Sequence, residues 1–145
     1  MANHFAVWID DLLGAVKDDA SPNAIKLIES CGKGCASRQN VFEFMVKLRN
    51  DASHCKTRTD YVEFLNERLP VTFTETTDGI IMHLGKDKCG CKMATEITKN
   101  ADALCNCTLG HEKATWSMFF GRPVDAEIVE SFLRGGNDCV IKIIV

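Results

Sequence analysis

Cysteines are the residues in this sequence whose type and spacing are best suited to chemistry. Eight of the 145 residues are cysteines, and four of them form two pairs, Cys89-Gly-Cys91 and Cys105-Asn-Cys107. Thiolates bind zinc and other soft metals, and a tetrahedral zinc site takes four cysteine or histidine ligands. On an extended segment, side chains two residues apart point to the same side. Each pair is therefore expected to reach one metal.

The predicted metal site draws at least three ligands from the two pairs and the last cysteine of the chain. This set is Cys89, Cys91, Cys105, Cys107 and Cys139. Zinc is the expected metal, with His111 as an additional nitrogen candidate. An Fe–S cluster is an alternative, because four cysteines ligate one equally well. Two interpretations without a metal stay open, namely small buried hydrophobic residues and reactive or disulfide-forming thiols.

Three further cysteines lie outside this predicted ligand set. Cys31 and Cys35 have the i, i+4 spacing that places two side chains on one face of a helix. The glycines in Cys31-Gly-Lys-Gly-Cys35 nevertheless predict that the helix ends there, with two packed thiols. Cys55 stands alone beside His54, and adjacent side chains usually diverge. We therefore do not predict a catalytic cysteine–histidine pair at this point.

Composition indicates the class of protein. The length fits a single domain over residues 1–145, with a helical half (1–69) and a cysteine-rich half of sheet plus helix (70–145). The net charge of −3, without a basic block, argues against nucleic-acid binding. No apolar run is long enough to span a membrane. No signal peptide is recognisable, so we expect a cytoplasmic location, where disulfides are disfavoured.

The first half has helical periodicity. Apolar residues recur every three or four positions from Phe5 to Val16, and Ser21-Pro22 is a helix start. A third helix is expected over 41–48. A fourth begins at the capping box Thr57-x-x-Asp60 and ends before Pro70.

The second half changes to the alternation of strands. Strands at 71–76 and 80–84 flank an Asp-Gly turn, and two more are expected at 124–128 and 140–145, with a helix over 108–120 before them. These elements predict an α+β fold. N-terminal helices pack on a twisted antiparallel sheet of about four strands, and one helix is inserted between the two strand pairs.

The last third of the chain resembles the C-terminal part of the 4-vinyl-reductase-like ligand-binding domains. The resemblance rests on the order Cys105, a helix, Gly121-Arg-Pro-Val, Gly135 and Cys139. Members that bind small molecules hold a structural zinc ion with a first cysteine, a glutamate, a second cysteine and a last cysteine. Cys105 and Cys139 match the first and last of these ligands.

The two middle ligands of that pattern are replaced in this sequence. Ile128 stands at the glutamate position and Ser131 at the second cysteine position. A shift by two residues recovers Glu130, but then Leu133 occupies the cysteine position. The resemblance thus leaves two ligands to be supplied by the extra cysteines, which are Cys89, Cys91 and Cys107.

The same resemblance implies a function. These domains bind aromatic or hydrocarbon ligands in an apolar pocket between helices and sheet, and two copies often pair through their N-terminal helices. Here the pocket residues are expected to be Phe73, Trp116, Phe119 and Phe120. The chain is therefore interpreted as a small-molecule-binding or sensor domain with a cysteine-ligated structural metal, able to form a homodimer. The 4-vinyl-reductase-like domains are related in fold to heme-nitric-oxide sensors and to vesicle-tethering subunits of the Bet type.

A second resemblance keeps an enzymatic alternative open. The layout KCGC, LCNC and a final cysteine is similar to that of uncharacterised bacterial and archaeal proteins related to L-2-aminothiazoline-4-carboxylate hydrolases. This similarity implies a small hydrolase acting on a cyclic C–N bond. Cys107 or Cys89 would then be the nucleophile, or a metal would keep an open position for water.

Overall fold

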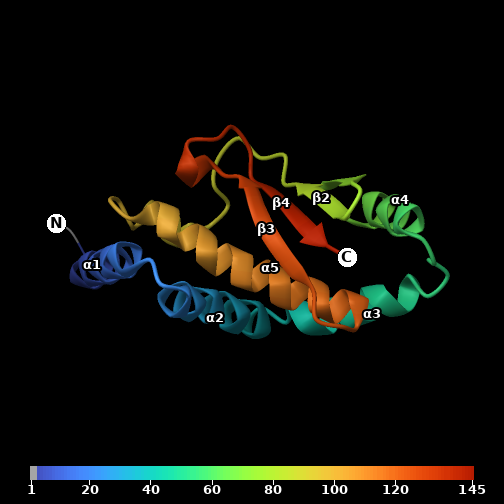
Figure 1. The fold of residues 1–145 in the computed structure, drawn as a ribbon, viewed down its shortest axis with the longest axis horizontal. Coiled ribbons are helices and arrows are strands. Elements are labelled where there is room, and N and C mark those ends of the chain that lie inside the picture. The colour runs from blue at the N-terminus through green and yellow to red at the C-terminus, as the bar shows by residue number, and fades with distance from the viewer. Residues whose placement is uncertain (1–2) are drawn as a thin grey trace.

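The computed structural model describes residues 3–145, which form a helical half followed by a half built on an antiparallel sheet (Figure 1). The helices of the first half are α1 (His4–Asp19), α2 (Pro22–Arg38), α3 (Val41–Asp51) and α4 (Arg58–Arg68). The second half contains β1 (Thr72–Glu75), β2 (Gly79–His83), the 3-10 helices η1 (Lys92–Thr95) and η2 (Ala101–Ala103), α5 (Leu104–Phe120), β3 (Asp125–Glu130), the 3-10 helix η3 (Phe132–Arg134) and β4 (Val140–Ile144).

Local capping explains where the first helices begin. The Asn3 side chain accepts a hydrogen bond from the Phe5 N–H at the start of α1, and the Ser21 hydroxyl accepts one from the Ala24 N–H at the start of α2. At α4 both halves of the Thr57/Asp60 capping box are formed. Each cap satisfies backbone N–H groups that have no partner inside the helix.

The four strands form one antiparallel sheet in the order β1-β2-β4-β3. β1 and β2 are joined by the predicted hairpin, and α5 connects β2 to the second strand pair. The predicted α+β fold, with one helix inserted between two strand pairs, is confirmed. In Figure 1, α5 runs along one face of the sheet, and α2 and α3 lie on the other side of α5.

Large side chains fill the space between α5 and the sheet. Phe73, Ile80 and Ile143 from the sheet are almost inaccessible to solvent, as are Trp116 and Phe119 from α5. Trp116 meets both Phe73 and Phe119 edge-on, with ring centroids 5.6 Å apart in each case. Edge-to-face pairs of this kind add about 0.5–1.5 kcal/mol to the burial of apolar area. This cluster is the main hydrophobic core of the protein.

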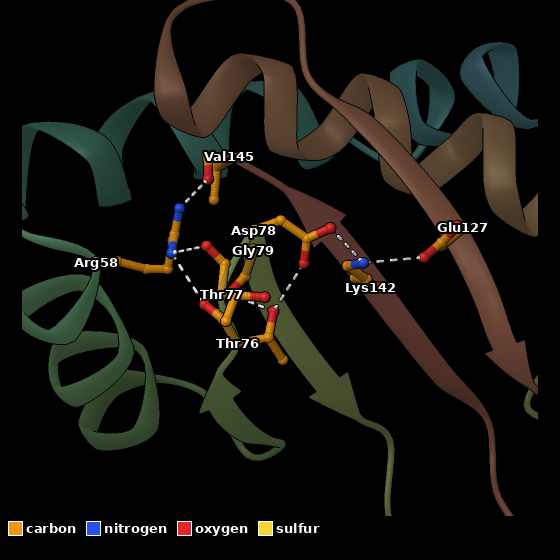
Figure 2. Close-up of polar contacts among 8 residues, drawn as sticks. All are labelled: Arg58, Thr76, Thr77, Asp78, Gly79, Glu127, Lys142 and Val145. Atoms are coloured by element: carbon orange, nitrogen blue, oxygen red, sulfur yellow. Dashed lines mark hydrogen bonds and ion pairs between the residues drawn. The ribbon is translucent and has the colours of Figure 1, made fainter.

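Polar contacts fasten the chain end and the hairpin turn beside this core (Figure 2). The Arg58 guanidinium donates to the carbonyl oxygens of Thr76 and Val145, at 2.9 and 2.6 Å. Lys142 lies between the carboxylates of Asp78 and Glu127, at 2.6 and 3.2 Å. These contacts connect α4, the hairpin, β3 and β4.

α2 continues through the glycines at which we expected it to end. A Cβ atom at Gly32 would lie 1.8 Å from the Cys107 carbonyl oxygen, and one at Gly110 would lie 1.9 Å from the Glu29 carbonyl oxygen. The two glycines therefore let the backbones of α2 and α5 touch. The prediction of a helix end was wrong because Gly32 serves close packing between helices rather than a turn.

Candidate functional site

The second Cys-x-Cys pair lies in the first turn of α5. This helix begins at Leu104, earlier than the predicted start at 108. Residues two apart on an α-helix are separated by about 200° around its axis, since a turn holds 3.6 residues. Cys105 and Cys107 therefore point to different sides of α5. The expectation that this pair reaches one metal assumed an extended segment and does not hold here.

Cys105 faces the strand side, where it lies near Cys139 and Cys89. Its Sγ atom is buried and lies 3.2 Å from the Ser131 hydroxyl oxygen. Burial raises the pKa of the Cys139 thiol, and the nearby charges of Cys89 and Cys105 raise it further. We call Cys89, Cys105 and Cys139 the sheet-side group.

Cys107 faces α2 and lies near three other cysteines, two on α2 and one just before η1. Burial raises the pKa of the Cys107 thiol to about 11, and the charges of Cys35, Cys91 and Cys31 contribute to the shift. We call Cys31, Cys35, Cys91 and Cys107 the helix-side group. The five predicted metal ligands are thus divided, three in one group and two in the other.

Sequence reasoning missed the part that Cys31 and Cys35 take in this arrangement. Their i, i+4 spacing was the signal that could have revealed it. The adjacent glycines hid this signal, because a glycine in a helix is more often read as its end than as a site of close packing.

An irregular segment, residues 84–103, carries the first Cys-x-Cys pair between β2 and α5. All of it is described, and only Ile97 and Ala103 in it are buried. It contains the short helices η1 and η2 and an open hollow of about 510 Å³ lined by residues 85–92 and Thr95. Long segments with so little regular structure are uncommon in compact domains and are often functional.

A buried carboxylate holds the end of this segment against α1. Asp10 accepts hydrogen bonds from the backbone N–H groups of Lys99 and Asn100, at 3.1 and 2.8 Å. Although burial opposes ionisation, these bonds hold the pKa of Asp10 below its ordinary value. Asp10 therefore positions the residues that lead into α5.

The chemistry of the two groups suits a soft metal, but their thiols are not gathered around a common point. Among residues 3–145, no set of three or more His, Cys, Asp or Glu side chains is arranged to hold a metal ion. A cysteine side chain reaches its sulfur through a single rotatable bond with three staggered positions. Rotation about these bonds is the movement that a metal would require of either group.

The other thiol and imidazole candidates have their own partners. The Cys55 thiol is buried, lies 3.7 Å from the Nε2 atom of His54 and donates to the Asp60 carbonyl oxygen. Burial raises the pKa of Cys55, so it does not resemble an activated nucleophile. His111 Nδ1 lies 3.2 Å from a carboxylate oxygen of Glu112 on the same helix.

The four aromatic residues of the predicted ligand pocket lie in or at the edge of the core. Phe73, Trp116 and Phe119 are buried there, and Phe120 packs at the margin of the core against Tyr61. A second open hollow of about 380 Å³ lies over α3 and is lined by Phe42, Glu43, Val46, Lys47, Asn50 and Met118. Neither described hollow is lined by the four aromatic residues, and the pocket stays a prediction.

The match to a known family covers almost the entire sequence. Residues 2–145 match DUF6144, which is described as a family of unknown function. The chain belongs to the DUF6144 family. No curated protein matches this DUF6144 chain.

Similar solved structures also exist. One is the crystal structure of a trafficking protein particle complex subunit 3 from Naegleria fowleri, covalently bound to palmitic acid. It is 14% identical, with a TM-score of 0.47, and the match covers 96% of this chain and 93% of that one.

No helix within residues 3–145 combines the length and the apolar character that crossing a membrane needs.

Proposed function

We propose that this DUF6144 protein is a small-molecule-binding domain stabilised by a structural metal, and that the sheet-side group holds a zinc ion. The observation that carries the metal site is that Cys89 and Cys105 lie near Cys139. They come from the irregular segment, the start of α5 and the residue before β4. A metal bound there would tie three separate parts of the chain together.

Ser131 supports this assignment. It is the residue that stands at the second cysteine position of the 4-vinyl-reductase-like pattern, and its hydroxyl lies 3.2 Å from the Cys105 sulfur. The side chain at that position is therefore beside the first ligand, as the resemblance requires. We propose that Cys89 supplies the thiolate that Ser131 lacks.

The irregular segment gives such a metal a structural role. Residues 84–103 bury few apolar side chains, so hydrophobic packing alone provides little to fix them. Zinc bound through Cys89 would attach the middle of this segment to α5 and β4. Ligand binding that occurs only in the folded state stabilises that state by mass action. The cytoplasmic location that we propose keeps the thiols reduced and free to bind metal.

The experiment compares Cys139→Ser with Cys55→Ser. We expect reduced, zinc-loaded Cys139→Ser to hold one metal ion fewer per chain than the wild type and to melt at a lower temperature. Cys55→Ser removes a thiol outside both groups and should keep the wild-type metal content. Native mass spectrometry and thermal melting measure both quantities. Equal metal content in Cys139→Ser and wild type would overturn the proposed site.

The small-molecule part of the proposal rests on the resemblance and on the aromatic residues between α5 and the sheet. Phe120 is the member of this set that reaches the margin of the core, where a ligand would enter. A small aromatic probe such as indole is expected to raise the melting temperature of the wild type and to have a smaller effect on Phe120→Ala. An equal effect on both proteins, or none on the wild type, would contradict this part.

A homodimer is the partner that we propose. α1 exposes an apolar stripe at i, i+3 and i+7, in which Phe5, Trp8 and Leu12 are 68%, 59% and 45% exposed. Such a stripe suits pairing with a second helix. Light scattering after size exclusion should give a dimer for the wild type and a monomer for Trp8→Glu. A monomeric wild type would exclude this partner.

A further inference from the structure

The contact between α2 and α5 brings three cysteines near one another. Gly32 of α2 touches the backbone of α5 at Cys107. A Cβ atom added at Gly32 would lie only 1.8 Å from the Cys107 carbonyl oxygen. Cys31 and Cys35 lie one residue before and three residues after this contact point, on one face of α2. Both therefore flank the place where α2 meets the residue that carries the Cys107 thiol.

The irregular segment adds the fourth cysteine. Cys91 immediately precedes η1 and, like Cys107, packs against a second hydrophobic cluster. That cluster is built from Ala6, Leu13, Ile28, Ile97, Ala103 and Leu104. Cys91 and Cys107 therefore share one environment at the end of the molecule formed by α1, α2 and the start of α5.

The surroundings of these sulfurs suit negative charge. The Gln39 side-chain amide donates a hydrogen bond to the Cys35 sulfur at 3.1 Å. Hydrogen bonds of this kind to ligand sulfurs recur around protein metal centres.

We infer that Cys31, Cys35, Cys91 and Cys107 form a second metal site, which takes a soft divalent ion such as zinc. Four cysteine ligands complete a tetrahedral coordination shell, so the site is closed and structural. Each thiol loses its proton to solvent as its sulfur–metal bond forms. The bound ion would hold α2, α5 and the irregular segment together, independently of the sheet-side group.

The test uses the full-length, reduced, metal-free protein and titrates it with Zn²⁺. Native mass spectrometry counts the bound ions, and thiol alkylation with peptide mapping identifies the protected cysteines. The wild type is expected to bind two ions and to protect seven cysteines from alkylation. The reactivity of Cys55, which belongs to neither group, should not depend on Zn²⁺. In Cys35→Ser we expect one ion, with Cys31, Cys91 and Cys107 alkylated together and the sheet-side group still protected.

Reciprocal variants separate this site from the one under Proposed function. Cys139→Ser should free Cys89 and Cys105 while the helix-side group stays protected. Loss of an ion in Cys139→Ser but not in Cys35→Ser would overturn the second site and leave the first intact. Cys31→Ser, which changes an exposed residue, repeats the test without affecting the core.

Other chemistry at these four cysteines would also overturn the inference. One such result is a disulfide within the helix-side group in protein purified without reductant. It would count against the site if Zn²⁺ still failed to bind there after reduction. Another is an iron–sulfide chromophore that Cys35→Ser abolishes. Far-UV circular dichroism of each variant confirms that the fold is kept.

Discussion

The two ends of α5 are held in place by different means. Its C-terminal half places Trp116 and Phe119 against the sheet, in a core of large side chains. Its N-terminal half packs against a smaller cluster of two alanines, two leucines and two isoleucines, namely Ala6, Leu13, Ile28, Ile97, Ala103 and Leu104. The seven cysteines of the helix-side and sheet-side groups lie near that second end, whereas Cys55 belongs to the first.

This difference indicates what each end requires for stability. Burial of aromatic residues is sufficient to fix the sheet end, because each large side chain removes much apolar area from water. The cysteine end buries smaller side chains and must also hold the irregular segment. Thiolate–metal bonds would stabilise the cysteine end, as hydrophobic packing stabilises the sheet end.

The largest effect is expected at the sheet end. Phe119→Ala removes a ring that is 1% exposed and should lower the free energy of unfolding by about 3–5 kcal/mol. Urea denaturation measures this loss. Zinc content should not change, because the cysteine groups lie at the other end of α5. A loss of zinc in a still folded Phe119→Ala protein would show that the two ends are not independent.

A smaller effect is expected where α2 meets α5. Gly32→Ala forces the two backbones apart and should cost about 2–3 kcal/mol. Because it moves Cys31 and Cys35 away from Cys107, it should also weaken zinc binding at the helix-side group.

Gly34→Ala is the matched control for Gly32→Ala. Its Cβ atom would meet only the flexible end of Arg38, at 3.1 Å. Because alanine favours the helix over glycine, this change should be neutral or stabilise by up to about 1 kcal/mol. Equal losses of stability in the two variants would contradict the close contact at Gly32.

The smallest effect concerns acid stability at the sheet end. Hydrogen bonds from the backbone N–H groups of Lys56 and Thr57 hold the pKa of Asp60 below its ordinary value. The ionised carboxylate thus stabilises the fold above the unfolded pKa of about 4, and this stabilisation is lost as the pH falls through the lower folded value. In Asp60→Asn, stability should vary less with pH in that acid range.

The measurement for Asp60 is urea denaturation between pH 3 and pH 7 in the presence of a chelator. The chelator is needed because acid also releases metal from thiolates. Identical pH profiles for Asp60→Asn and the wild type would show that the capping carboxylate adds nothing to acid stability.

The fold was largely predictable because its signals are local. Ser21-Pro22, the capping box and the Asp-Gly turn each act within a few residues, and periodicity distinguished helix from strand. The division of the cysteines was not predictable in this way. It depends on α5 beginning at Leu104 and on Gly32 touching α5, and both are consequences of contacts between segments distant in the sequence.

Hydrogen exchange of the zinc-loaded protein, with and without a chelator, tests most directly whether metal holds the cysteine end. Amides of residues 84–103 and of the first turns of α5 should exchange faster after chelation, while those of β2, β4 and the end of α5 keep their protection. Unchanged exchange over 84–103 after the metal has been removed would contradict this account.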